Sequence, residues 1–178
     1  MSYHEITVVI TTFRSDIKIK SCLNSLKRDL KVIIIENSDR LDFKKKIEEK
    51  YSNVTCYLAG ENLGYAKGNN LGLSKVKTKY ALILNPDAVV EANAIENFLL
   101  TARKEKDFAI IAPYIQKEKE AINKNFKNIS EIQDVKSVKG FAMFLNLEQF
   151  KEIGFFDDNF FIYFEEIDLC NRLKKENK

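Results

Sequence analysis

The chain has 178 residues and a mass of 20.6 kDa, a size that fits one globular domain with a substantial core. Its formal net charge is +3, and its lysines are spread along the chain, so the concentrated basic stripe of a nucleic-acid-binding protein is missing. A weak attraction to an anionic membrane or a phosphorylated acceptor is compatible with this charge.

The cysteines and the first residues indicate the compartment. The cysteines are far apart and match no metal-ligand spacing or disulfide framework, which favours a reducing environment. The opening "MSYHEITVVITTF" lacks the basic start and long apolar core of a signal peptide, and no segment approaches the roughly 20 apolar residues of a membrane span. We therefore expect a soluble cytoplasmic protein, free or held peripherally at the inner face of the membrane.

The first two thirds of the chain alternate apolar runs with helical patterns. Strands are expected at 6–13, 31–37, 54–59, 79–85 and 108–113. Helices are expected between them: one with an apolar face from Ile19 to Leu30, a short one marked by Phe43, Ile47 and Tyr51, and one at about 92–105. Strands of near-continuous Val, Ile and Leu separated by helices predict an α/β fold, with a mostly parallel sheet covered on both faces.

The last third begins differently. Residues 115–137 are polar and weakly periodic, which indicates a surface excursion, and such loops on a rigid sheet are the expected place for the choice of a binding partner. A strand at 138–146 follows, and then a short helix that Gly154 closes. No repeat or linker appears, so we expect a single domain over residues 1–178.

Polar residues gather where the predicted strands end. The three strand ends read Thr11-Thr12-Phe13, Glu36-Asn37-Ser38 and Asn85-Pro86-Asp87. In parallel sheets, ligands bind at the carboxyl ends of the strands. The sequence therefore predicts a site along this edge of the sheet.

The stretch "GENLGYAKGNNLG" places glycines four residues apart from Gly60 to Gly72. One interpretation is a turn followed by a helix that packs tightly on the sheet, and this suffices for Gly68 and Gly72. The other is a helix amino terminus whose backbone approaches a phosphate or sugar, with Asn62 and Lys67 supplying polar contacts. Asn62 and Gly64 fit this second interpretation better.

Asn85-Pro86-Asp87 also has two interpretations of equal weight. Proline commonly stops a strand, and aspartate in a turn often caps the next element. A carboxylate at the ligand edge can instead hold Mg²⁺, which proteins bind through one or two carboxylates together with substrate phosphates.

The block "GFFDDNFFIYFEEIDLCNRLKK" joins an aromatic run to an acidic helix start. Glu165, Asp168 and Arg172 share one face of this helix. Acids favour the first turn of a helix, and Arg172 can pair with Asp168, which is a purely structural explanation. Aromatic side chains beside carboxylates can also form a pocket in which one acid acts as a general base.

Taken in order, these blocks make the chain resemble the family 2 glycosyltransferases, in particular their rhamnosyltransferase-like branch. The matching stretches are "VVITTFRS" with "CLNSL", "IIIENSD", "ENLGYAKGNNLG", "LILNPDA" and "GFAMFLNLEQFKEIGFFDDNFFIYFEEIDLCNR". The resemblance implies a GT-A fold, a Rossmann-like three-layer α/β/α sandwich. It also implies an inverting transfer of a sugar from a nucleotide donor, a UDP- or dTDP-sugar, to a saccharide or lipid-linked saccharide acceptor in surface polysaccharide or glycolipid synthesis.

The resemblance also implies roles for residues. The donor-binding set is Thr11, Thr12, Phe13, Glu36, Asn37, Asn62, Gly64, Lys67, Asn85 and Asp87. Within it, Asp87 matches the family's ligand for a divalent metal, Mg²⁺ or Mn²⁺. Glu166 falls at the position of the catalytic base, with Glu165 and Asp168 beside it in the catalytic set, whereas Arg172 is expected to be structural.

Departures from the family pattern leave alternatives open. Asn85 replaces the first acid of the Asp-x-Asp form, and Glu36 and Glu166 replace aspartates. The chain ends at Lys178, where relatives continue with further helices, so we expect a catalytic domain without that extension. The alternatives are a truncated nucleotide-sugar-binding module without turnover and another nucleotide-sugar transferase, such as a nucleotidyltransferase.

Overall fold

The computed structural model describes residues 3–114 and 132–178. In this part of the chain, six strands form one sheet in the order β3-β2-β1-β4-β6-β5. Their bounds are Ile6–Thr12 (β1), Lys31–Glu36 (β2), Val54–Leu58 (β3), Tyr80–Leu84 (β4), Ile110–Ile111 (β5) and Ala142–Asn146 (β6). The pairings among β1 to β4 are parallel, whereas β6 runs antiparallel to both β4 and β5, which confirms a mostly parallel sheet.

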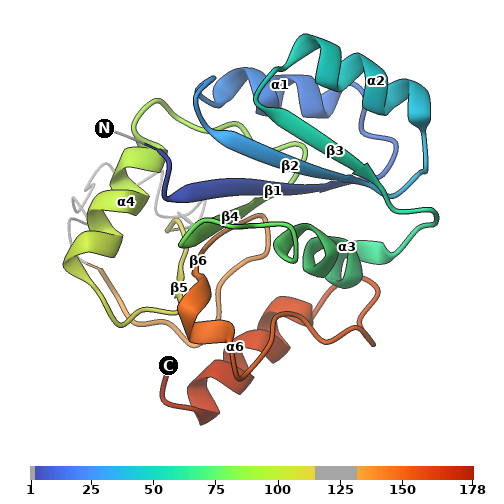
Figure 1. Cartoon of the computed structure of the whole chain (residues 1–178). Coiled ribbons are helices and arrows are strands. Elements are labelled where there is room, and N and C mark those ends of the chain that lie inside the picture. Colours follow the sequence, from blue (N-terminus) through green and yellow to red (C-terminus); the bar gives the residue numbers. More distant parts are fainter. Residues whose placement is uncertain (1–2, 115–131) are drawn as a thin grey trace, which may run out of the picture.

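Helices cover both faces of the sheet (Figure 1). Helices α1, α2 and α4 share one buried cluster with the sheet, and α3 and α6 share a second cluster with its other face. The bounds are Lys18–Ser25 (α1), Leu41–Lys50 (α2), Gly64–Leu73 (α3), Ala94–Lys104 (α4) and Glu165–Lys175 (α6). The predicted three-layer α/β/α sandwich is therefore confirmed.

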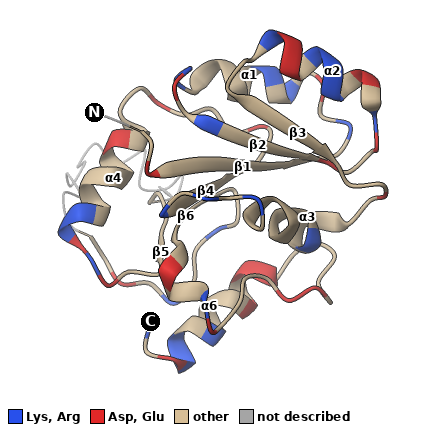
Figure 2. Ribbon diagram, viewed as in Figure 1, with Lys and Arg blue, Asp and Glu red and all other residues tan. Residues whose placement is uncertain are grey.

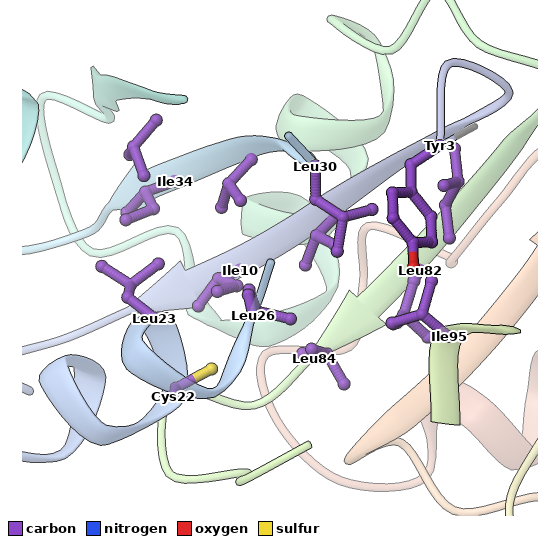
Figure 3. Packing of buried hydrophobic residues seen from close by; sticks show 14 of the residues in the cluster. Tyr3, Ile10, Cys22, Leu23, Leu26, Leu30, Ile34, Leu82, Leu84 and Ile95 are labelled. Carbon is purple, nitrogen blue, oxygen red and sulfur yellow. The ribbon is translucent and has the colours of Figure 1, made fainter. Parts of the chain in front are cut away.

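Strand alternation explains why there are two clusters. Val8 and Ile10 of β1 point into the first cluster, whereas Val9 between them points into the second. Figure 3 shows part of the first cluster, with Ile10 and Ile34 on the side of the α1 residues Cys22 and Leu23, and Leu82 beside Tyr3 and Ile95. Each fully buried aliphatic side chain of this kind contributes about 1.5–3 kcal/mol through apolar burial.

Helix α1 is shorter than its apolar pattern predicts. The pattern runs to Leu30, but the helix ends at Ser25. The Ser25 hydroxyl donates to the Cys22 carbonyl at 2.6 Å and accepts the Val90 backbone N–H at 2.9 Å. A serine hydroxyl that bonds to nearby backbone competes with continuation of the helix. Leu30 stays fully buried because the chain turns back onto the core.

The predicted strand at 108–113 is also shortened, since β5 contains two residues and pairs only with β6. It lies at the edge of the sheet and Pro113 follows it closely, and proline cannot donate to a strand ladder.

The strand expected at 138–146 begins at Ala142. A 3₁₀ helix at Leu147–Phe150 then leads to Gly154, whose φ of +71° and N–H bond to the Phe150 carbonyl match the expected glycine closure.

Helix α3 packs tightly on the sheet. A Cβ at Gly68 would lie 2.6 Å from the Thr11 methyl group, and one at Gly72 would lie 2.5 Å from a Val9 methyl group. The close-packing interpretation of these two glycines is therefore confirmed.

Most of the polar excursion, residues 115–131, lies outside the described residues, as does the role in acceptor choice expected of it. Residues 132–137 form neither helix nor strand. Within 3–114 and 132–178, no helix is long and apolar enough to cross a lipid bilayer.

Candidate active site

The carboxyl ends of β1, β2 and β4 meet at one edge of the sheet, as predicted. The Asn37 N–H donates to the Thr12 carbonyl at 2.8 Å, and the Arg14 N–H donates to the Ser38 hydroxyl at 2.9 Å. On the other side of β1, the Asn85 N–H donates to the Phe141 carbonyl just before β6 begins. The start of antiparallel β6 therefore belongs to the same edge.

The end of β1 presents side chains of different character. Thr11 donates its hydroxyl to the Asn69 side chain of α3 at 3.0 Å. Thr12 is buried, and its hydroxyl has no hydrogen-bond partner among the described residues. Phe13 is 47% exposed, and the Arg14 guanidinium lies 5.3 Å from the centre of its ring. An exposed ring beside a strand end can stack on a planar base.

Glu36 and Asn37 at the end of β2 are both buried. The Glu36 carboxylate accepts the Arg40 N–H at 2.7 Å, so it shapes the loop that leads into α2. Asn37 donates its amide to the Gly64 carbonyl at 2.8 Å, while its own side-chain oxygen has no partner in the described part of the chain. The side chains from the ends of β1 and β2 therefore hold the start of α3 in place.

At the start of α3, Asn62 accepts the Gly64 N–H at 3.1 Å. Gly64 has a φ of +75°, and a Cβ there would lie 2.3 Å from the Phe161 carbonyl oxygen. This close approach alone requires a glycine, so the structure gives Gly64 a packing role in addition to its predicted contact with a donor. Lys67 is exposed and lines a hollow. It lies on a different face of α3 from Gly68, which packs on the sheet.

Asp87 lies in the turn after β4 with its side chain 50% exposed, and its carboxylate is 3.3 Å from the Lys18 ammonium. No group of three or more potential metal-ligating residues exists within the described residues. A single exposed carboxylate does not form a closed protein site, but it suits Mg²⁺ or Mn²⁺ that takes most of its ligands from a diphosphate. An exposed carboxylate such as that of Asp87 therefore suits one ligand position on an ion that a diphosphate also holds.

The acid pair begins α6 behind the exposed aromatic run. Glu165 is 5% exposed, and one carboxylate oxygen each of Glu165 and Glu166 is buried without a hydrogen-bond partner among the described residues. Burial raises the pKa of Glu165 above its ordinary value, and the neighbouring Glu166 charge acts in the same direction. Figure 2 shows acidic residues at the start of α6 and basic residues toward its end, the favourable arrangement for a helix dipole.

Asp168 and Arg172 lie one and two turns further along the helix. Their side chains form an ion pair at 2.7 Å. Arg172 also donates to the carbonyls of Ile153, at 3.0 Å, and Phe155. The structural role expected of Arg172 is therefore confirmed, and Asp168 is held in that same network.

Tyr65 connects the two sides of the site, although sequence reasoning did not select it. Its hydroxyl donates to the Gly140 carbonyl, its N–H donates to the Phe161 carbonyl at 2.7 Å, and its ring packs edge-on against Phe156. Burial raises its pKa, and so do the nearby charges of Glu165 and Glu166. The available signal was a large aromatic residue between Gly64 and Ala66 at a predicted helix start.

Seven buried side-chain oxygens lack a hydrogen-bond partner within the described residues, and four of them belong to this edge: those of Thr12, Asn37, Glu165 and Glu166. Buried polar atoms are normally paired, so this concentration is typical of a binding or catalytic site.

The chain is similar to a hexosyltransferase and to a rhamnosyltransferase. It is 24% identical to the low-salt glycan biosynthesis hexosyltransferase Agl10 of Haloferax volcanii, and the match covers 97% of this chain and 62% of the relative. It is also 24% identical to rhamnosyltransferase WbbL of Escherichia coli, over 93% of this chain and 75% of the relative.

Solved structures share the fold. The mannosyltransferase PcManGT from Pyrobaculum calidifontis, solved in complex with GDP-Man and Mn²⁺, superimposes with a TM-score of 0.76 at 14% identity, over 95% of this chain and 51% of its own. Residues 1–349 of S. aureus TarS give a TM-score of 0.72 at 13% identity, with coverage of 95% and 55%. This chain thus spans little more than half of each structure. Both neighbours have the GT-A fold, which confirms the predicted fold class.

The sequence also matches the model of "Glycosyl transferase family 2" over residues 7–170, nearly the whole chain. The ordered motifs, the sheet edge and this match agree: the chain belongs to glycosyl transferase family 2.

Proposed function

We propose that this chain carries the catalytic domain of an inverting glycosyltransferase. It would transfer a sugar from a nucleoside diphosphate donor to an acceptor hydroxyl during polysaccharide or glycolipid assembly. Family membership supports the reaction class, and the two similar transferases, one of which acts in glycan biosynthesis, support the setting. The observation that carries the proposal is the acid pair of Glu165 and Glu166, placed at the same edge as the strand ends.

Glu166 acts as the general base in this mechanism. The acceptor hydroxyl gives its proton to the Glu166 carboxylate as its oxygen forms a bond to the anomeric carbon. The bond from that carbon to the diphosphate oxygen breaks on the opposite face, and its electron pair leaves with the nucleoside diphosphate. Attack from the face opposite the leaving group inverts the configuration of the anomeric carbon.

The strand ends hold the donor. Phe13 offers its exposed ring to the base, and the buried side chains of Thr12 and Asn37 shape the neighbouring strand ends. Asn62 and the start of α3 lie toward the diphosphate. Asp87 would hold Mg²⁺ or Mn²⁺, whose positive charge, when bound, stabilises the departing diphosphate. The Lys18 ammonium lies 3.3 Å from the Asp87 carboxylate.

The neighbours support a nucleotide-sugar donor without identifying it. TarS has been solved with UDP and with UDP-GlcNAc, and PcManGT with GDP-Man. We propose a UDP- or dTDP-sugar as the donor, a saccharide or lipid-linked saccharide as the acceptor, and a cytoplasmic location at the inner face of the membrane.

The donor site is tested by thermal unfolding with UDP, dTDP or GDP, each with and without Mg²⁺ or Mn²⁺. A ligand that binds only the folded state raises the melting temperature by mass action. We expect one diphosphate to raise it more with metal than without, and Asp87→Ala to remove the metal-dependent part. Asp107→Ala is the matched control, because Asp107 is an exposed acid that precedes β5. No shift with any diphosphate would contradict the proposal.

The base is tested by Glu166→Gln. Loss of a general base lowers kcat by about 10²–10⁴-fold. We expect a loss of that size with unchanged diphosphate binding, whereas Glu176→Gln at the exposed end of α6 should keep full activity. Retained activity in Glu166→Gln would assign the base elsewhere.

A further inference from the structure

Four consecutive apolar side chains stand in solvent directly before the acid pair. The exposed fractions are 55% for Phe161, 51% for Ile162, 71% for Tyr163 and 67% for Phe164. Scattered exposed apolar residues are common, but a continuous apolar patch marks an interaction site. This aromatic segment, residues 161–164, is therefore a candidate interaction surface.

The backbone is strained in order to present these side chains. Tyr163 and Phe164 both adopt left-handed φ angles, 70° and 71°, which bulky side chains rarely tolerate. Such strain persists where surrounding contacts hold the chain, and it concentrates at functional sites. Core packing does not explain this backbone strain, because the rings of Tyr163 and Phe164 are mostly exposed to solvent.

Contacts with α3 hold the segment in place. The Phe161 carbonyl accepts the Tyr65 N–H at 2.7 Å, and Gly64 allows this close approach. Further back, the Asn70 amide donates to the Phe156 carbonyl and to the Asp158 carboxylate, both at 2.8 Å. The backbone and the Phe161 ring thus lie against α3, while Tyr163 and Phe164 are mostly exposed, which gives a preorganised binding surface.

A polar hollow of about 260 Å³ lies beside the segment and shares Phe161 with it. Its lining includes the amides of Asn62 and Asn159 and the carboxylate of Asp158. Amide and carboxylate groups next to an aromatic ring suit a sugar, which has an apolar face of C–H groups and a rim of hydroxyls. The hollow and the segment together match the two kinds of surface on a carbohydrate.

The surrounding charge selects among partners. Acidic residues flank the segment, with Asp157 and Asp158 before it and Glu166 after it, whereas Asp168 is paired with Arg172 and Glu165 is nearly buried. In the lining of the hollow, Lys67 is the one basic residue, and Glu61 and Asp158 oppose it. Asp157 and Asp158 would repel an anionic lipid surface from the segment itself, whereas a neutral saccharide would not be repelled.

We propose that the aromatic segment 161–164 binds the neutral saccharide portion of the acceptor, with Tyr163 and Phe164 as its stacking platform and with Asp158 and Asn159 as the polar groups on its side of the hollow. The proposal rests on the function proposed above, because the acceptor hydroxyl must reach Glu166, two residues beyond Phe164. It places acceptor recognition on described residues, in addition to any role of residues 115–137.

The test measures binding of the whole chain to an array of neutral and acidic oligosaccharides, and in parallel to vesicles of phosphatidylcholine with and without phosphatidylglycerol. The main variant is Tyr163→Ser/Phe164→Ser. Leu100→Ser on α4 is the control, since Leu100 is an apolar residue of similar exposure, 51%, on a distant helix. Phe164→Gly is a second variant, which removes the ring and relieves the backbone.

We expect wild type and Leu100→Ser to bind neutral oligosaccharides, and the double variant to bind them at least tenfold more weakly. Phe164→Gly should lose glycan binding with an unchanged or higher melting temperature. The inference is overturned if no neutral glycan binds, if the double variant binds glycans like wild type, or if the variants lose vesicle binding alone. Oligosaccharide binding needs no nucleotide donor. A chain that binds no diphosphate but binds oligosaccharides would therefore contradict the proposed donor site and not the proposed acceptor surface.

Discussion

At the scale of single residues, the acid pair includes a buried carboxylate, that of Glu165, in an environment that disfavours its charge. Its carboxylate is nearly buried at the start of a helix, one of its oxygens has no partner in the described part of the chain, and a second acid follows immediately. Burial without a full set of hydrogen bonds disfavours the charged form, and this outweighs the favourable helix dipole, since the pKa of Glu165 is raised. The sequence could not decide between these opposing effects, because burial depends on the packing of α3 against the loop before α6.

Glu165→Gln should therefore stabilise the protein at neutral pH. Because the folded-state pKa of Glu165 lies above its unfolded value, the folded state binds more protons between the two values, and stability falls as pH rises through that window. Glu165→Gln has no ionisable carboxyl at this position, so its stability does not fall in that pH window. We expect a higher urea midpoint than wild type at pH 7, and a smaller difference at pH 4, near the ordinary carboxyl pKa of about 4.3.

Glu152→Gln serves as the control, because Glu152 is exposed and has no ion pair among the described residues. A Glu165→Gln advantage of equal size at both pH values would contradict a buried, charge-disfavoured carboxylate.

At the scale of elements, α3 was predicted well and α1 and β5 were not. The four-residue spacing of glycines identified a helix that approaches the sheet closely, and Thr11 and Val9 do contact it. The end of α1 and the two-residue length of β5 depend on a hydroxyl contact to Val90 and on a position at the sheet edge. Local periodicity predicts neither the end of α1 nor the length of β5, because both depend on how residues distant in sequence are arranged in the fold.

Gly68→Ala should destabilise the protein despite the better helix propensity of alanine. Alanine gains about 1 kcal/mol over glycine in a helix, whereas overpacking costs about 1–3 kcal/mol. Because Thr11 is β-branched and stiff, the clash at its methyl group should win by about 1 kcal/mol. This corresponds to a fall of about 2–4 °C in melting temperature for a domain of this size.

Lys67→Ala, one residue earlier on an exposed position of the same helix, should change the melting temperature little. A Gly68→Ala protein as stable as wild type would mean that the sheet can give way at Thr11.

At the scale of the whole molecule, the site joins two parts of the sheet. The parallel strands β1, β2 and β4 end in the predicted donor residues, while antiparallel β6 and the segment after it carry the acid pair. Tyr65 spans the two parts through Gly140 and Phe161. We therefore regard Tyr65 as a positioning residue for Glu165 and Glu166.

Tyr65→Phe should lower kcat, by about tenfold, and leave diphosphate binding unchanged. It removes the hydroxyl bond to Gly140 while keeping the ring and the backbone bond to Phe161, so a shift of the acid pair by a fraction of an ångström is the expected effect. Tyr57→Phe on β3 is the control, because Tyr57 is a partly exposed residue on the edge strand. A loss confined to melting temperature, with kcat intact, would show that the Tyr65 hydroxyl is only structural.

The sequence by itself determined the class of the fold, the family and the edge of the sheet where polar residues gather. These follow from local patterns, namely apolar runs, helical spacing and ordered motifs, which depend on residues close together in the chain. Tertiary structure alone decided that Gly64 meets Phe161, that Tyr65 lies beside the acid pair, that Arg172 reaches the Ile153 carbonyl, and that residues 161–164 stand exposed. Burial, desolvation and strain arise when elements distant in sequence pack together, and no local pattern records them.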